Sequence, residues 1–212
     1  MADELWAMVV LVDEDAPPAD AAPDDADASP YPAAGAGWGW VGLVASERGL
    51  RLLTLPSATR AAALRALRYD YPDAPLVELA PEATDVEAAG PAALLQAAAQ
   101  QVRRYLAGSL QEFDVPLDLR GHTSFALSVW AVAAKIPYAQ TRSYAWVARQ
   151  LGGDSRGVYQ AVGAALGSNP IPLIIPCHRV VGSDGSLHGY AGGLAMKARL
   201  LALETGQQRL LI

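Results

Sequence analysis

Residues 171–181 read IPLIIPCHRVV, an apolar run interrupted by prolines that carries the single cysteine of the chain, Cys177. A lone buried cysteine is more often an inert apolar residue than a nucleophile. Its neighbours His178 and Arg179, however, both favour a thiolate over the thiol. Adjacent side chains of an extended segment point to opposite faces, so His178 reaches the sulfur only through a bridging water or a turn. These residues alone leave a nucleophile and a structural cysteine as equal alternatives.

Two short helices are predicted just before this run. One begins at Thr141 or Ser143 and extends to about residue 151, and the other begins at Asp154 or Ser155 and extends to about residue 166. Hydroxyl and carboxylate side chains can accept hydrogen bonds from the free amides at a helix start. A glycine turn joins the two helices, which makes the pair a helix-turn-helix candidate.

The second of these helices is rich in small side chains, which allow a neighbouring helix or a DNA groove to approach closely. The small residues are Gly157, Ala161, Gly163, Ala164 and Ala165. Near its start, Arg156, Tyr159 and Gln160 supply a candidate polar edge for reading DNA. Packing against another helix is the more common use of such a surface.

The first half of the chain has the pattern of a small α/β unit. The predicted elements are strands at 5–12 and 75–79, a β-hairpin at 38–55 and helices at 57–69 and 92–106. Residues 13–37 are rich in acidic residues, proline and alanine, and are predicted to form a disordered or loosely held loop. This half shows no catalytic constellation.

The fold class expected for the whole chain is α/β (α+β) with two domains. Residues 1–112 form a small N-terminal α/β accessory domain. Residues 113–212 form a mainly helical domain that holds the helix-turn-helix and Cys177. A helix over residues 125–135 opens this second domain and is broken at Ile136-Pro137-Tyr138.

The two halves differ in charge. The chain carries a formal net charge of −6, but residues 1–119 contribute −12 and residues 120–212 contribute +6. Such asymmetry is a recognised indication of polyanion binding by the basic part. An uneven but merely solvated surface explains the charges equally well.

Cysteine and histidine usage restricts the chemistry. One cysteine excludes an intramolecular disulfide and a multi-cysteine metal site, and it fits a reducing cytoplasm. The three histidines show no zinc-ligand spacing, so we expect no metal. No apolar run has the length of a membrane span, and the acidic first residues do not fit a secretory signal.

The residues around Cys177 resemble the active-site signature of the O6-alkylguanine-DNA alkyltransferases. The resemblance covers about residues 121–206, and the N-terminal unit resembles the accessory domain of that family in outline. The matching motifs are Phe125 to Trp130, Ile136-Pro137-Tyr138, Thr141-Arg142-Ser143-Tyr144, Ala161-Val162-Gly163, Asn169-Pro170, Ile175 to Val180, Gly189 to Gly193, and Lys197 ahead of Leu200 to Glu204.

The resemblance implies direct-reversal DNA repair with single turnover. The damaged guanine is flipped out of the duplex, and Cys177 attacks its O6-alkyl carbon. His178, acting through a water and oriented by Glu204, takes the thiol proton. Tyr144 donates toward guanine N3 and presses on the adjacent phosphate, while Asn169 fixes the turn after the DNA-reading helix. The implied pocket lining is Tyr190, Ala191, Gly192 and Gly193. A thioether has no evident route to hydrolysis, so the chain is both reagent and acceptor, and no cofactor is implied.

The implied partner is double-stranded DNA containing O6-alkylguanine, bound by a monomer. The implied DNA-binding residues are Arg156, Tyr159, Gln160, Ala161, Gly163 and Arg179. The family usually has an arginine where this chain has Gln160, which predicts weakened repair of duplex DNA unless Gln160 or Tyr159 enters the base stack. Alkyl-group preference, and preference for O6-alkylguanine over O4-alkylthymine, stay open.

Three other functions fit parts of the sequence. A non-catalytic binder of alkylation lesions resembles this family but replaces the cysteine, so Cys177 disfavours it. A helix-turn-helix transcription regulator and a cysteine hydrolase are further alternatives, and the hydrolase needs an oxyanion site that the sequence does not show. Tyr144 and Tyr190, taken singly, also fit ordinary core aromatics.

Overall fold

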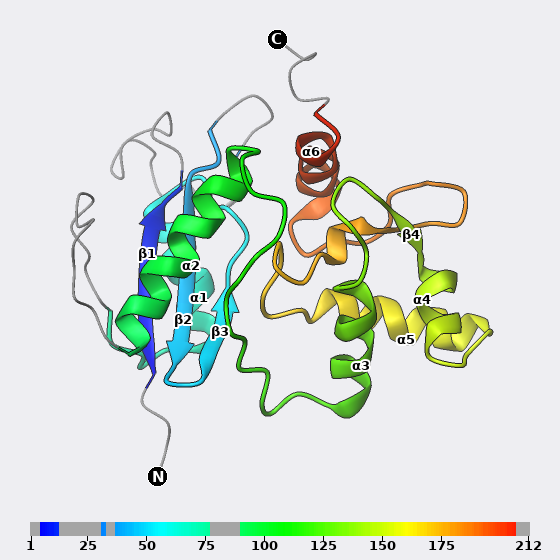
Figure 1. The fold of residues 1–212 in the computed structure, drawn as a ribbon, viewed down its shortest axis with the longest axis horizontal. Helices are drawn as coiled ribbons and strands as arrows, with labels where there is room; N and C mark the ends of the chain where they lie inside the picture. Colours follow the sequence, from blue (N-terminus) through cyan, green and yellow to red (C-terminus); the bar gives the residue numbers. More distant parts are fainter. Residues whose placement is uncertain (1–4, 13–30, 33–36, 77–89, 207–212) are drawn as a thin grey trace. The chain divides into compact units, whose positions relative to one another are not determined.

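The computed structural model describes residues 5–12, 31–32, 37–76 and 90–206 (Figure 1). The chain divides into two compact units, Met1–Asp118 and Leu119–Ile212, and each is described here by itself. The predicted domain boundary after residue 112 stays a prediction. The predicted loop over 13–37 lies almost wholly outside the described residues, as does the end of the strand predicted at 75–79.

An antiparallel sheet of three strands forms the centre of the first unit. Its strands are β1 (Trp6–Leu11), β2 (Trp40–Ser46) and β3 (Gly49–Leu53), in the order β1-β2-β3. Gly49 lies against the backbone of residues 116–117. A Cβ atom at this position would come within 2.6 Å of the Pro116 carbonyl oxygen, which explains the glycine at the hairpin turn. The predicted hairpin is therefore present. Of the strand predicted at 75–79, the described part forms a single bridge between Leu76 and Ala7.

Two helices cover the sheet on opposite faces (Figure 1). They are α1 (Arg60–Asp70), capped by the Thr59 side chain, and α2 (Pro91–Leu106). Both contact the central strand β2, which is buried along nearly its whole length. The apolar side chains on the two faces of β2 therefore pack against α1 and α2, and the unit has its own core.

The second unit is mainly helical. Its helices are α3 (Ser124–Ala133), α4 (Tyr144–Gln150), α5 (Arg156–Gly167) and α6 (Gly193–Glu204). The Ser143 hydroxyl accepts a hydrogen bond from the backbone N–H of Trp146 at 3.0 Å and so caps α4. α4 and α5 pack against each other and against α3. The helix pair predicted from the glycine turn is thus present.

The segment after α5 contains a turn at Cys177, which is one of the two alternatives that the sequence left open for His178. Residues 171–181 are not continuously extended: Cys177–Arg179 form a short 3-10 helix, followed by strand β5 (Val180–Val181). β5 pairs in parallel with β4 (Arg142–Ser143), in the register Arg142 to Val180. Proline restricts the backbone at residue 176, and the resulting turn changes the direction of the side chains on either side of Cys177.

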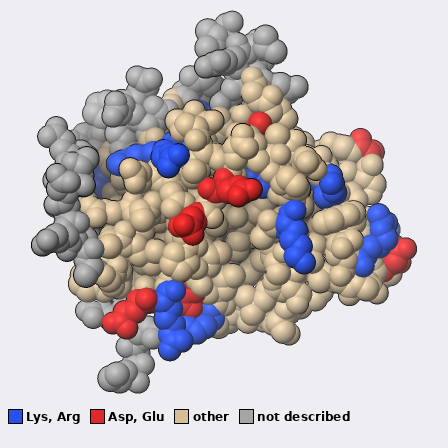
Figure 2. Space-filling view, viewed as in Figure 1, with Lys and Arg blue, Asp and Glu red and all other residues tan. Residues whose placement is uncertain are grey.

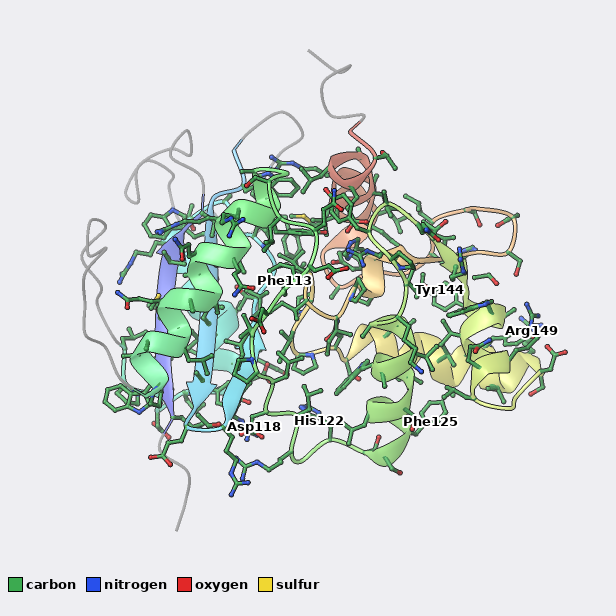
Figure 3. All side chains as sticks on the ribbon, viewed as in Figure 1. Phe113, Asp118, His122, Phe125, Tyr144 and Arg149 are labelled. Carbon is green, nitrogen blue, oxygen red and sulfur yellow. The ribbon has the colours of Figure 1, made fainter. Side chains whose placement is uncertain are left out.

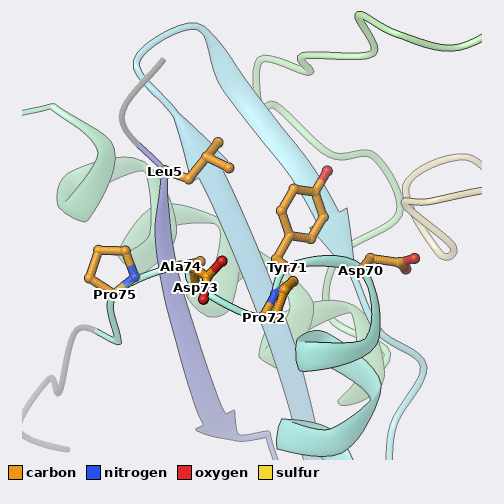
Figure 4. Close-up of a pocket in the computed structure, with 7 residues that line it drawn as sticks. All are labelled: Leu5, Asp70, Tyr71, Pro72, Asp73, Ala74 and Pro75. Atoms are coloured by element: carbon orange, nitrogen blue, oxygen red, sulfur yellow. The ribbon is translucent and has the colours of Figure 1, made fainter. Parts of the chain in front are cut away.

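The described residues contain no helix with the length and apolar character of a membrane span. Nor do they contain a cluster of three or more His, Cys, Asp or Glu side chains placed to hold a metal. An open groove of about 620 Å³ lies in the first unit between the start of β1 and the end of α1 (Figure 4). Its lining is apolar and acidic and includes Leu5, Asp70, Tyr71 and Asp73. None of the residues singled out by the sequence lies in it.

Candidate active site around Cys177

The side chain of Asn169 holds the segment that carries Cys177. Its Oδ1 accepts a hydrogen bond from the backbone N–H of Ile171 at 3.0 Å, and its Nδ2 donates to the Ile175 carbonyl at 2.8 Å. The same Nδ2 lies 3.2 Å from Cys177 Sγ. Asn169 therefore closes the turn after α5, as the resemblance implied, and in addition donates to the sulfur, which the sequence did not predict.

The surroundings of Cys177 set the protonation of its thiol. The residue is only 7% exposed, and burial raises its pKa above the usual value for a thiol. The hydrogen bond from Asn169, the charge of Lys197 and the hydroxyl of Tyr190 each lower the pKa, but burial outweighs them. The resting form at neutral pH is therefore the thiol, and the three polar groups stabilise the thiolate once a base has taken the proton.

His178 is the candidate for that base. Its ring is fully buried, and its Nε2 lies 2.8 Å from Glu204 Oε1. Burial lowers the pKa of His178, and the hydrogen bond and charge of Glu204 oppose this only in part, so the ring is neutral at pH 7. A carboxylate accepts hydrogen bonds but cannot donate them, so the proton of the neutral ring lies on Nε2. Nδ1 is then the basic nitrogen.

Arg179 differs from its predicted role. It is buried, and its Nε and Nη2 donate to the Glu204 carboxylate at 2.8 to 3.0 Å, while Nη1 donates to the Ile136 carbonyl at 2.7 Å. The expectation that Arg179 contacts DNA is therefore wrong, because its guanidinium is used inside the protein. It neutralises Glu204 and, together with the backbone N–H of Ala139, fixes the carboxylate that orients His178.

Lys197 is the site residue to which the sequence analysis gave no role. Its side chain is fully buried on α6, and Nζ donates to the carbonyls of Val180 at 2.6 Å and His188 at 3.0 Å, with Tyr144 Oη at 3.5 Å. Burial lowers the pKa of Lys197, and the Cys177 thiolate opposes this. The ammonium therefore joins β5 to the loop that follows it and supplies positive charge near the sulfur.

Tyr144 is the first residue of α4 and is half-buried between α5 and α6 (Figure 3). A Cβ atom on Gly163 would lie 3.8 Å from its ring, and the His188 ring centroid lies 6.5 Å from its own. Burial raises the pKa of Tyr144, and the negative charge on Cys177 raises it further. Tyr144 thus stays a phenol and can donate a hydrogen bond. Gly163, expected to contact DNA, instead faces Tyr144.

The four residues expected to line a pocket, residues 190–193, form the turn that leads into α6. Tyr190 is partly buried and lowers the pKa of Cys177 through its hydroxyl. Gly193 adopts φ +76°, which favours glycine, and its N–H donates to the Tyr190 carbonyl at 2.9 Å. Ala191 is exposed and Gly192 is buried. The four predicted residues are thus one tight turn, with Tyr190 on the side of the sulfur.

α5 presents a flat face to solvent. Its buried residues Val162, Ala165 and Leu166 pack inward. The exposed residues are Arg156, Gly157, Gln160, Ala161, Ala164 and Gly167. No helix among the described residues of the second unit covers these small side chains, so of the two predicted neighbours a groove of DNA fits this surface better. Figure 2 shows basic side chains over the part of this unit that holds β4, α4 and α5.

Tyr159 and Gln160 differ in how they are held on α5. The Tyr159 hydroxyl hydrogen-bonds to the Asp154 carboxylate in the preceding turn, and Arg149 approaches the same carboxylate at 4.0 Å. Gln160 is exposed beside Ala161. The Tyr159 side chain is therefore held against the turn before α5, whereas the Gln160 side chain is exposed and makes no hydrogen bond to that turn in the part of the chain that the structure describes.

The class of protein that this fold and site define is a helix-turn-helix protein with a buried cysteine beside a carboxylate–histidine pair. The sequence model of the family described as 6-O-methylguanine DNA methyltransferase, DNA binding domain, matches residues 124–206. A crystal structure of the O6-methylguanine methyltransferase of Mycobacterium tuberculosis is 32% identical, covers 95% of this chain and 93% of its own, and has a TM-score of 0.64. The chain therefore belongs to the O6-methylguanine-DNA methyltransferase family.

Curated relatives agree with this assignment. The methylated-DNA–protein-cysteine methyltransferase of Mycolicibacterium paratuberculosis is 51% identical over 107 residues, which is 50% of this chain and 63% of the relative. That of Methanosarcina barkeri is 48% identical over 112 residues, 53% of this chain and 69% of the relative. The match to the M. paratuberculosis protein thus spans less than two thirds of its length. A structure of the M. tuberculosis protein in complex with DNA is 36% identical over 80% of this chain and 89% of its own, with a TM-score of 0.58.

Proposed function

We propose that this chain repairs alkylated DNA by transferring an alkyl group from O6 of guanine to Cys177. The observation that carries the proposal is the buried series formed by Cys177, His178 and Glu204, with Asn169 donating to the sulfur. The relatives named as cysteine methyltransferases support it. In the transfer, the bond between O6 and the alkyl carbon breaks and a bond between that carbon and Sγ forms.

The proton balance follows from the protonation states of the site. The thiol proton passes through a water to Nδ1 of His178, which then carries a positive charge that the Glu204 carboxylate stabilises. The departing guanine takes a hydrogen bond, or a proton, from the Tyr144 hydroxyl at N3. The proton held by His178 finally replaces the one that the guanine takes up, so that neutral guanine, neutral His178 and the Tyr144 phenol remain. Lys197 and Asn169 stabilise the negative charge on the sulfur as it attacks.

The exposed face of α5 is the proposed surface for duplex DNA. Small residues let the backbone of α5 approach a groove, and Arg156 adds positive charge at its start. The target base must leave the stack to reach a buried sulfur. Gln160, which is not tied to the turn, is the residue proposed to fill the gap that the base leaves. The M. tuberculosis structure with DNA supports a DNA partner.

The proposed reaction has consequences for the whole protein. The thioether at Cys177 is stable, so each chain reacts once, and the damaged DNA supplies the alkyl group without a cofactor. Cys177 must stay reduced to react, which requires a reducing compartment such as the cytoplasm. We further propose that the chain acts as a monomer, and that O4-alkylthymine is a second possible substrate class.

The test is to mix the protein with duplex DNA containing O6-methylguanine and to weigh the protein and its peptides. The expected result is one added methyl group on the peptide that contains Cys177, with loss of the lesion. Cys177→Ala should bind the same duplex without gaining mass. Binding by the unchanged protein with no gain of mass overturns the proposal and favours a lesion sensor or a regulator.

A further inference from the structure

Arg142 lies on β4, and its contacts hold its guanidinium without neutralising it. Nη1 donates to the Thr141 carbonyl at 2.8 Å, and Nη2 donates to the side-chain oxygen of Gln140 at 3.1 Å. The guanidinium carbon lies 5.7 Å from the ring centroid of Trp146, above its face. An aromatic face fixes the plane of a guanidinium and leaves its edge N–H groups directed outward. The fork also has more donors than these two contacts use.

The absence of a carboxylate distinguishes Arg142 from the three described arginines that lie within 4.0 Å of one. Arg179 is paired with Glu204, Arg51 with Asp118, and Arg149 approaches Asp154. Within the part of the chain that the structure describes, no carboxylate lies within salt-bridge distance of Arg142. A guanidinium that only neutral groups hold keeps its full attraction for an anion. Its planar fork fits the paired oxygens of a phosphodiester.

The position of Arg142 connects this charge to the reactive site. β4 pairs with β5, and Arg142 lies opposite Val180, which directly follows the 3-10 helix of Cys177. Arg142 also precedes Tyr144, the first residue of α4, by two residues. Arg142 is therefore close in the chain to the residue that contacts the base in the proposed reaction.

We propose that Arg142 binds a backbone phosphate of the DNA strand whose base reaches Cys177. This inference rests on the proposed function for the identity of the strand, but the contact itself needs only a phosphodiester. Arg142 is a binding residue and takes no part in proton transfer. Trp146 and Gln140 position its guanidinium in advance, so that little side-chain freedom is lost on binding.

The test measures binding to duplex DNA as a function of salt. Dissociation constants of the unchanged protein and of Arg142→Met are measured between about 50 and 300 mM salt, with and without O6-methylguanine, in a Cys177→Ala background that cannot react. Loss of one phosphate contact makes the slope of the logarithm of the association constant against the logarithm of the salt concentration less negative by about 0.9. At about 0.1 M salt the same change weakens binding about eightfold. Arg142→Lys keeps the charge and should keep most of the slope.

Two controls separate a phosphate contact from a structural effect. Arg65→Met removes an equal charge from an exposed position of α1 in the first unit. The salt dependence of DNA binding by this variant should equal that of the unchanged protein. With Cys177 present, Arg142→Met should react with the nucleoside O6-methyl-2′-deoxyguanosine, which has no phosphate, as fast as the unchanged protein does.

An unchanged slope for Arg142→Met, or an equal change for Arg65→Met, overturns the proposal. So does a slower reaction of Arg142→Met with the nucleoside, since that indicates a disturbed site. Failure of the unchanged protein to take up a methyl group overturns the proposed function instead. The slope on undamaged duplex still decides the role of Arg142 in that case.

Discussion

The buried centre at Cys177 and the exposed face of α5 are built in opposite ways. The centre consists of polar groups that bind one another: Glu204 accepts from His178 and from Arg179, and Lys197 donates to two carbonyls. The α5 face consists of small and uncharged side chains with Arg156 at one end. The protein therefore organises the chemistry before any ligand arrives, whereas the recognition surface gains its contacts only from the ligand.

The largest effect is expected where the buried network loses its only carboxylate. Glu204→Gln leaves the Arg179 guanidinium buried and uncompensated, which should lower the free energy of unfolding by about 3–5 kcal/mol. It also removes the charge that stabilises protonated His178, so methyl transfer should slow by at least about a hundredfold. Denaturant unfolding and single-turnover kinetics measure the two effects.

An exposed carboxylate supplies the matched control for that prediction. Asp154→Asn removes the negative charge of the side chain that accepts from the Tyr159 hydroxyl, close to Arg149, at the solvent-exposed turn before α5. Exposed ion pairs contribute little to stability. Unfolding and transfer should therefore change far less than in Glu204→Gln. Equal losses in the two variants would contradict the contrast between centre and surface.

An intermediate effect is expected from pH, through the buried ring of His178. Burial holds the pKa of His178 below its value in the unfolded chain, so at low pH the unfolded chain binds a proton that the folded protein does not. The contribution of neutral His178 to the free energy of unfolding is therefore fully present above about pH 6.5. It is lost as pH falls below that value, by at most about 1.4 kcal/mol per pH unit.

Denaturant unfolding between about pH 7 and pH 5 measures this loss, with His178→Asn as the comparison. The variant lacks the titrating ring, so its stability should fall less steeply over that window. Parallel curves for the two proteins would show that His178 is not held neutral by burial, and the assignment of Nδ1 as the base would lose its support.

The smallest effect is expected on the α5 face. Gln160→Arg places a guanidinium beside Ala161 where the side chain is exposed. It should speed methyl transfer on duplex DNA by about threefold to tenfold, because a charged side chain in the gap left by the flipped base favours the extruded state. Reaction with a single strand should not change, because no base has to leave a stack. Gln160→Met, of similar length and without charge, is the control. An equal gain on single strands would remove base extrusion as the reason.

The sequence was sufficient for the parts that depend on local pattern. The glycine turn between α4 and α5 and the hairpin of β2 and β3 follow from residues close in the chain. Cys177, His178 and Glu204 were brought together only by the resemblance. Glu204 lies 26 residues after His178. No periodicity links the two.

The failures have equally specific causes. Arg179 was assigned to DNA as part of what the resemblance implied, but its partners Glu204 and Ile136 lie far away in the sequence. Lys197 was given no role, since a lysine on a helix is ordinarily exposed. Its ammonium is held by one carbonyl of β5 and one of the loop after it, whose positions only the folded chain defines.

The most direct test of the account is the number of lesions that one chain repairs. The protein is titrated with an excess of duplex DNA carrying O6-methylguanine, and repaired lesions are counted against chains until the reaction stops. A buried cysteine that ends as a thioether predicts that repair stops at one lesion per chain, with the methyl group on Cys177. Continued repair beyond one lesion per chain, or repair that leaves Cys177 unmodified, would contradict it.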